Sequence, residues 1–147
     1  MKNKKTKVSG FRSKFFTGII SASLILLLAT PALAASWTME MKYATVSGKN
    51  NGQTYSLNAG TRTVTGQIWA TNWNNNLTNT VSVGSVLYKS NPVLADSRIA
   101  STTSTVNKNG VKRNMEIKAT GQAKGTYYLY FHKPNNQTTV KGSGTIK

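Results

Sequence analysis

Residues 125–133 read Gly-Thr-Tyr-Tyr-Leu-Tyr-Phe-His-Lys, and this stretch decides the fold. Successive side chains of a β-strand point to opposite faces, so the alternation divides the stretch into two sets. The set that we expect to lie in a core comprises Tyr127, Leu129 and Phe131. The opposite set, which we expect to be exposed, comprises Tyr128, Tyr130 and His132. Such a pattern predicts a strand with one face buried.

Comparable patterns recur along the chain, separated by turns rich in Asn, Gly and Pro. Seven further segments have this character: 37–43, 53–57, 61–73, 77–89, 99–106, 111–119 and 138–146. Short strands at this spacing are typical of an antiparallel β-sandwich, either immunoglobulin-like or jelly-roll-like, with a small barrel as the alternative. We therefore expect an all-β domain of about eight strands.

Four local features carry more specific predictions. The Asn-Gly pair in residues 107–110 predicts a tight hairpin between the strands on either side. The inward parity slips near Gly84 and Ser85, where a β-bulge would account for the change. Tyr43 continues the inward set of the first strand. Residues 93–97 fit either a helical turn or the start of a strand.

The segment Gly-Thr-Tyr-Tyr-Leu-Tyr, residues 125–130, resembles late strands of many immunoglobulin-like and fibronectin-like modules. The pattern covers under a tenth of the chain. This resemblance implies a fold and carries no function with it.

The first 34 residues have the organisation of a secretory signal peptide with a short signal helix. Six Lys and Arg residues without an acid precede an apolar run over residues 17–29. Ala32 and Ala34 then stand at the −3 and −1 positions of a cut after Ala34. The run is shorter than the ~20 residues of a membrane-spanning helix, so we favour cleavage over an uncleaved anchor. We expect a secreted protein, extracellular or loosely wall-associated, with one domain over residues 35–147.

Residues 35–147 are strongly basic, because 13 of the 19 Lys and Arg residues lie there with all three acidic residues, a net charge of +10. Such a field attracts an anionic cell-wall polymer or polysaccharide, or the headgroups of an anionic membrane in peripheral contact, and we disfavour nucleic acid as the partner. The charges could equally be dispersed over solvated strand faces, since no run of four basic residues follows residue 34. The chain contains no cysteine, so packing and sheet hydrogen bonds must hold the domain.

The residues available for catalysis are few. Residues 35–147 contain one His, three carboxylates and no Cys, and no Gly-x-Ser-x-Gly elbow occurs. No His-x-His pair or Asp-rich loop indicates a metal site. We therefore expect a non-enzymatic protein without a metal or another cofactor.

Aromatic side chains are the best candidates for a binding site. Strict alternation places Trp69 and Trp73 on one face, where sugar rings could stack on them, although we favour the alternative that the pair fills the core or an end cap. The predicted outward set of residues 125–133 offers a second aromatic surface. The complete set of candidate ligand-binding residues is Trp69, Trp73, Lys124, Tyr128, Tyr130, His132 and Lys133.

The leading hypothesis is a secreted, basic β-domain that binds an anionic or carbohydrate polymer of the cell envelope or extracellular matrix. A secreted antibacterial or toxin-like protein that acts on the envelope of other cells is the alternative. A third hypothesis is a matrix protein that self-associates through Thr- and Asn-rich edge strands.

Overall fold

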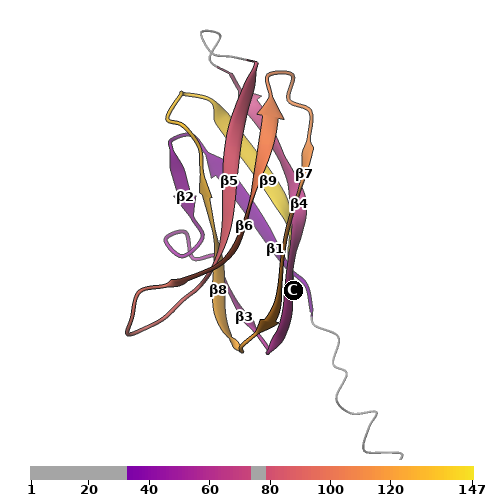
Figure 1. Cartoon of the computed structure of the whole chain (residues 1–147). Helices are drawn as coiled ribbons and strands as arrows, with labels where there is room; N and C mark the ends of the chain where they lie inside the picture. The colour runs from indigo at the N-terminus through magenta and orange to yellow at the C-terminus, as the bar shows by residue number, and fades with distance from the viewer. Residues whose placement is uncertain (1–32, 74–78) are drawn as a thin grey trace, which may run out of the picture. The chain divides into compact units, whose positions relative to one another are not determined.

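The computed structural model describes residues 33–73 and 79–147, whereas residues 1–32 and 74–78 lie outside the described residues (Figure 1). The predicted signal peptide and its helix fall almost wholly on residues outside the described part, so export stays a prediction. Within the described part, no helix is long and apolar enough to cross a membrane.

Nine antiparallel strands and no helix occur in the described residues. They are β1 (Ala35–Met41), β2 (Thr45–Ser47), β3 (Thr54–Leu57), β4 (Gly60–Asn72), β5 (Thr80–Lys89), β6 (Ser97–Asn107), β7 (Arg113–Gln122), β8 (Gly125–His132) and β9 (Thr139–Ile146). Sheet A has the order β1-β9-β4-β7, and sheet B has the order β2-β8-β5-β6 with β3 also paired to β8. The two sheets pack as a sandwich, which confirms the predicted fold class (Figure 1).

Strand β8 lies inside sheet B, as its alternation predicts. It pairs with β5 on one side, and with β2 and then β3 along the other. The predicted core set is buried, with Tyr127, Leu129 and Phe131 exposed by 0%, 2% and 3%. Between β2 and β3, the Gly48 N–H donates a 2.8 Å hydrogen bond to the Leu129 carbonyl. The edge beside β8 is therefore one interrupted strand, and this interruption raises the strand count above eight.

Trp37 is the largest fully buried side chain, and glycines make room for it in sheet A. A Cβ atom added at Gly66 would lie 2.3 Å from the indole Cζ2 atom, and one added at Gly142 would lie 3.1 Å from Cζ3. At Gly144, an added Cβ would lie 2.0 Å from the Thr65 carbonyl oxygen. The indole Nε1–H donates a 3.2 Å hydrogen bond to the same Thr65 oxygen. Strands β1, β9 and β4 thus close around one ring because the neighbouring strand positions lack side chains.

The turn at residues 107–110 forms, but the predicted hairpin is wrong. The Gly110 N–H donates to the Asn107 carbonyl at 3.2 Å, and Gly110 has a φ of 71°, which glycine adopts without strain. However, β6 pairs with β5 in sheet B, whereas β7 pairs with β4 in sheet A. The Asn-Gly pair reverses the chain without determining which sheet the next strand joins.

The predicted bulge near Gly84 and Ser85 is also wrong. The register of β5 with β6 is continuous there and shifts instead between Leu87 and Tyr88. Val86 is only 5% exposed although it lies on the outer face of sheet B. Burial on both faces of β5 produced the apparent change of parity.

Two further expectations are settled by where strands end. Tyr43 is 75% exposed because β1 ends at Met41, so its predicted inward position is wrong. Residues 93–96 form neither a helical turn nor a strand, and β6 begins at Ser97. These residues belong to a connection that projects from the sandwich (Figure 1).

Candidate functional site

The two candidate tryptophans occupy different environments. Trp69 is half-buried on the outer face of sheet A, where it pairs across strands with Lys141. Trp73 packs against the core. The register of β4 against β9 shifts between Ala70 and Asn72, and the additional residue changes the parity of the chain beyond it. The expectation of one shared tryptophan face is therefore wrong, and the alternative that the pair fills the core holds for Trp73 alone.

Two lysines flank the Trp69 ring. The Nζ atom of Lys112 lies 4.9 Å from the centroid of the Trp69 ring, within the range of a cation–π contact. Lys141 forms an ion pair with Glu40 on β1 at 3.3 Å, and Lys42 approaches the same carboxylate at 3.6 Å. The hydrogen bond from Lys141 is the main cause that lowers the pKa of Glu40. This face therefore carries an ionised carboxylate within a cationic surrounding.

An open cavity of about 350 Å³ lies beside Trp69. It extends from β4 over β9 to β1 and reaches the β2–β3 loop, whose Gln53 amide oxygen accepts a 3.2 Å hydrogen bond from the Thr38 N–H. The cavity, which we call the Trp69 groove, is lined by Thr38, Met39, Glu40, Asn51, Gln53, Trp69, Lys141, Gly142 and Ser143.

The Trp69 groove combines three kinds of chemistry. The indole offers an apolar π-face on which a flat ligand can stack. Amide and hydroxyl groups from the two edges and the floor can donate and accept hydrogen bonds, and they are Thr38, Asn51, Gln53 and Ser143. Lys141 adds a positive charge that can meet an anionic substituent. Such a mixture of one aromatic platform with convergent polar groups suits a polyhydroxylated ligand.

Sheet B bears the second candidate surface, an aromatic stripe formed by Tyr88, Tyr128, Tyr130 and His132. The centroids of Tyr88 and Tyr128 lie 5.4 Å apart with an interplanar angle of 11°, so these rings stack on each other. Tyr130 meets Tyr88 edge-on at 6.1 Å, and His132 lies 6.2 Å from Tyr130. The sequence interpretation missed Tyr88, which the antiparallel register places directly opposite Tyr128.

The stripe is less accessible than predicted. Tyr128 is only 7% exposed, so its predicted exposure is wrong, while Tyr130 is half-buried and His132 is exposed. The imidazole of His132 lies over Gly84, where an added Cβ would be 2.1 Å from Nε2. Because Tyr88 and Tyr128 cover each other's faces, little π-surface remains there for a ligand.

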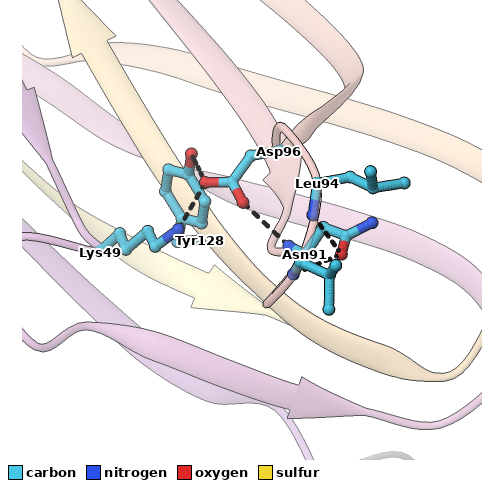
Figure 2. A network of polar contacts seen from close by, with 6 residues as sticks. Lys49, Asn91, Leu94, Asp96 and Tyr128 are labelled. Atoms are coloured by element: carbon cyan, nitrogen blue, oxygen red, sulfur yellow. Dashed lines mark hydrogen bonds and ion pairs between the residues drawn. The ribbon is translucent and has the colours of Figure 1, made fainter.

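Asp96 connects three segments beside this stripe (Figure 2). Its Oδ2 atom accepts hydrogen bonds from the Tyr128 hydroxyl and the Lys49 ammonium group, each at 2.8 Å. Its Oδ1 atom accepts a 2.9 Å bond from the Asn91 N–H. The bond from Lys49, with those from Asn91 and Tyr128, lowers the pKa of Asp96 to about 2. Burial, with the Asp96 bond and charge, raises the pKa of the Tyr128 hydroxyl.

The two lysines predicted to flank the stripe have different environments. Lys124 is exposed in the turn between β7 and β8. Lys133 is only 5% exposed, and its Nζ donates to the Pro134 carbonyl at 3.2 Å and to the Asn136 side chain at 3.3 Å. The ammonium group thus holds the β8–β9 loop and is turned away from solvent, and the predicted contact of Lys133 with a ligand stays a prediction that this burial does not favour.

The acidic residues give no sign of a metal centre in the described part of the chain. Glu40 lies on β1 and Glu116 on β7, which are opposite edges of sheet A. Among the residues that the structure describes, no group of three His, Cys, Asp or Glu side chains could hold a metal ion.

No protein-family model matches the sequence, and no curated protein sequence matches it. The fold is similar to a solved structure described as "CBM4 structure and function", with a TM-score of 0.51, 10% sequence identity, and coverage of 79% of this chain and 77% of that one. A second similar structure is a Yersinia pseudotuberculosis-derived mitogen, with a TM-score of 0.38, 9% identity, and coverage of 78% and 85%. The first likeness shows that the sandwich architecture occurs in a known carbohydrate-binding module, CBM4.

Proposed function

We propose that this chain is a secreted, non-catalytic protein that binds a polysaccharide of the cell envelope or extracellular matrix through the Trp69 groove. The observation that carries the proposal is the open cavity of about 350 Å³ in which an indole lies among amide, hydroxyl and charged side chains. The C–H face of a pyranose ring stacks on an aromatic side chain, while its hydroxyl groups require hydrogen bonds at the rim.

Each side of the groove has a role in this proposal. Trp69 supplies the stacking face, and the Lys112 ammonium group fixes the indole from one side. Gln53 and Ser143 hydrogen-bond to sugar hydroxyls across the floor. Lys141 binds a carboxylate or phosphate substituent, and it is already drawn toward this face by Glu40. The groove crosses the strands of sheet A and is open to solvent, so a polymer can pass along it rather than end in it.

Four further observations support the proposal. The fold is similar to CBM4, a carbohydrate-binding module. The net charge of +10 in residues 35–147 raises the local concentration of an anionic polymer. Two of the three carboxylates, Glu40 and Asp96, are engaged in ion pairs and are therefore not free for acid–base chemistry. The predicted signal peptide supports export to a compartment where such polymers occur.

A binding assay with the exported chain tests the proposal. Its ligands are purified bacterial cell walls with teichoic acid, the same walls without it, and a neutral β-glucan. The bound fraction is measured by sedimentation across a salt series. We expect Trp69→Ala to weaken binding at least about tenfold, the equivalent of ~1.4 kcal/mol. Tyr43→Ala is the matched control, because Tyr43 is an aromatic residue that is 75% exposed away from the groove.

Lysine variants separate the electrostatic contribution to the affinity from the contribution of stacking and hydrogen bonds. Lys112→Gln with Lys141→Gln should weaken binding to the anionic wall and remove much of its salt dependence, with a smaller effect on the neutral glucan. The proposal fails if no polysaccharide binds at any salt concentration, or if Trp69→Ala binds as tightly as the unaltered protein.

A further inference from the structure

The connection between β5 and β6 presents two apolar side chains to solvent. Val93 is 86% exposed and Leu94 is 72% exposed. Both belong to the connection that follows β5 and projects from the sandwich (Figure 1). We call this pair the apolar tip. Burying either side chain would lower the free energy of the protein, and this gain is not realised while both side chains are exposed to solvent.

The tip is held in place by an ordered set of hydrogen bonds. The Asn91 side-chain oxygen accepts bonds from the N–H groups of Val93 at 3.0 Å and Leu94 at 3.1 Å. Asp96 binds the Asn91 N–H, and Asp96 is itself held by Tyr128 and Lys49 (Figure 2). These bonds tie the loop to strand β8 and to the β2–β3 loop. The loop is therefore built to present the tip in one conformation, which lowers the entropy cost of any contact that it makes.

The surroundings of the apolar tip are cationic. Lys89 ends β5, Arg98 lies at the start of β6, and Lys49 contacts Asp96. Asp96 is the one carboxylate of this end, because the other two of the chain lie on β1 and β7 of sheet A. A loop that exposes two apolar side chains and has a basic residue at the strand end on each side, Lys89 and Arg98, is complementary to a surface with an anionic outer layer and an apolar interior.

We propose that Val93 and Leu94 insert into the interface of an anionic lipid bilayer, while Lys89 and Arg98 contact the headgroups. Apolar side chains gain free energy in proportion to the apolar surface that they bury at the acyl boundary, and each basic residue near an anionic leaflet adds to the attraction. Two side chains give reversible attachment, which suits a protein that also holds an external polymer. This inference does not depend on the Trp69 groove, which lies on the other sheet.

Co-sedimentation with two kinds of vesicle tests the inference. One kind contains phosphatidylcholine alone, and the other adds roughly 30% phosphatidylglycerol, which gives a strong surface potential. The exported chain is used, with its N-terminus verified by mass spectrometry so that an uncleaved signal peptide does not bind lipid itself. We expect binding to the anionic vesicles that weakens with salt. The double variant Val93→Ser, Leu94→Ser should lose at least about tenfold of this affinity.

Val111→Ser is the matched control, because Val111 is an exposed valine, at 47%, beside the turn between β6 and β7. It should bind as the unaltered protein does. Since the chain contains no cysteine, Leu94→Cys and Val111→Cys can each be labelled with an environment-sensitive fluorophore. The label at residue 94 should shift to the blue when anionic vesicles are added, and the label at residue 111 should not.

Three outcomes would overturn the inference: no binding to anionic vesicles, equal binding by the double variant, or a label at residue 94 that stays in water while the protein binds. The last two would assign the binding to dispersed charge. Loss of vesicle binding with unchanged polysaccharide binding in the double variant would separate the tip from the Trp69 groove.

Discussion

Two glycine-to-alanine substitutions in strands should change stability by very different amounts, because different atoms lie in the way of the new methyl group. At Gly144, the added Cβ would lie 2.0 Å from the Thr65 carbonyl oxygen and 2.5 Å from the Gly66 Cα. Both obstacles are backbone atoms of β4. At Gly84, the obstacle is the imidazole of His132, whose Nε2 would lie 2.1 Å away. His132 is exposed and can rotate aside.

The cost at Gly144 follows from the distances. Real Cβ atoms essentially never come closer than 3.0 Å to such a neighbour, so β9 and β4 must separate locally by about 1 Å. This separation breaks about two ladder hydrogen bonds, at ~1 kcal/mol each. Strain in the packing around Trp37 adds ~2 kcal/mol. The reduced freedom of the unfolded chain returns ~1 kcal/mol. We expect Gly144→Ala to lower the free energy of unfolding by about 3 kcal/mol.

Gly84→Ala should change the free energy of unfolding by less than about 1 kcal/mol. The alanine brings the same entropic gain from a less flexible unfolded chain, and rotating the exposed His132 ring aside cancels only a small part of that gain. Urea denaturation followed by the fluorescence of the three tryptophans, of which Trp37 is fully buried, measures both values. The melting temperature of Gly144→Ala should fall by roughly 10 °C. Equal stability of the two variants, or a Gly144→Ala protein within 1 kcal/mol (about the error of the measurement) of the unaltered chain, would refute the packing described for sheet A.

Two other substitutions probe buried or paired charges. The pKa of Asp96 falls from 3.8 to about 2 in the folded state, so its contribution to stability is present above about pH 4 and is lost as the pH falls toward 2. The stability difference between the unaltered chain and Asp96→Asn, measured by urea denaturation, should therefore shrink across this range; a constant difference contradicts the Lys49 pairing. Arg62 is 3% exposed, lies 4.6 Å from the Tyr127 ring centroid and donates to the Asn58 and Ala123 carbonyls. Arg62→Lys should cost about 2 kcal/mol in thermal unfolding, because an ammonium group cannot keep both bonds and the stacking, and a neutral effect would contradict this role.

Much of the sandwich could be predicted because alternation is a local property. The pattern around Tyr127, Leu129 and Phe131 reports directly which side chains face the core, and all three are buried. The same rule failed at Trp73, since one additional residue between Ala70 and Asn72 reverses the parity and no residue type there announces it. Alternation thus predicts faces well within a regular strand and poorly beyond an irregularity.

Pairing between strands was beyond the reach of the sequence. The turn before Val111 joins two sheets, yet its Asn-Gly pair is the same as in a hairpin. The sequence indicated Trp69 as a candidate binding residue because it is aromatic. Its groove could not be predicted, because the β2–β3 loop that helps to line it contacts sheet A only in the folded chain. The side-chain partners of Asp96 could not be predicted from its neighbours in the sequence, because Lys49 and Tyr128 are 47 and 32 residues away.

The placement of Tyr128 changes what the aromatic stripe contributes to function. A tyrosine that served as a ligand platform would keep a ring face open, whereas Tyr128 is 7% exposed, stacks on Tyr88 and donates its hydroxyl to Asp96. That bond helps to fix the loop that carries Leu94. We therefore interpret the stripe on sheet B as support for the loop that carries Leu94, and we assign the proposed polymer binding to the Trp69 groove on sheet A. The two proposed contacts lie on different faces, so neither needs to be released for the other to form.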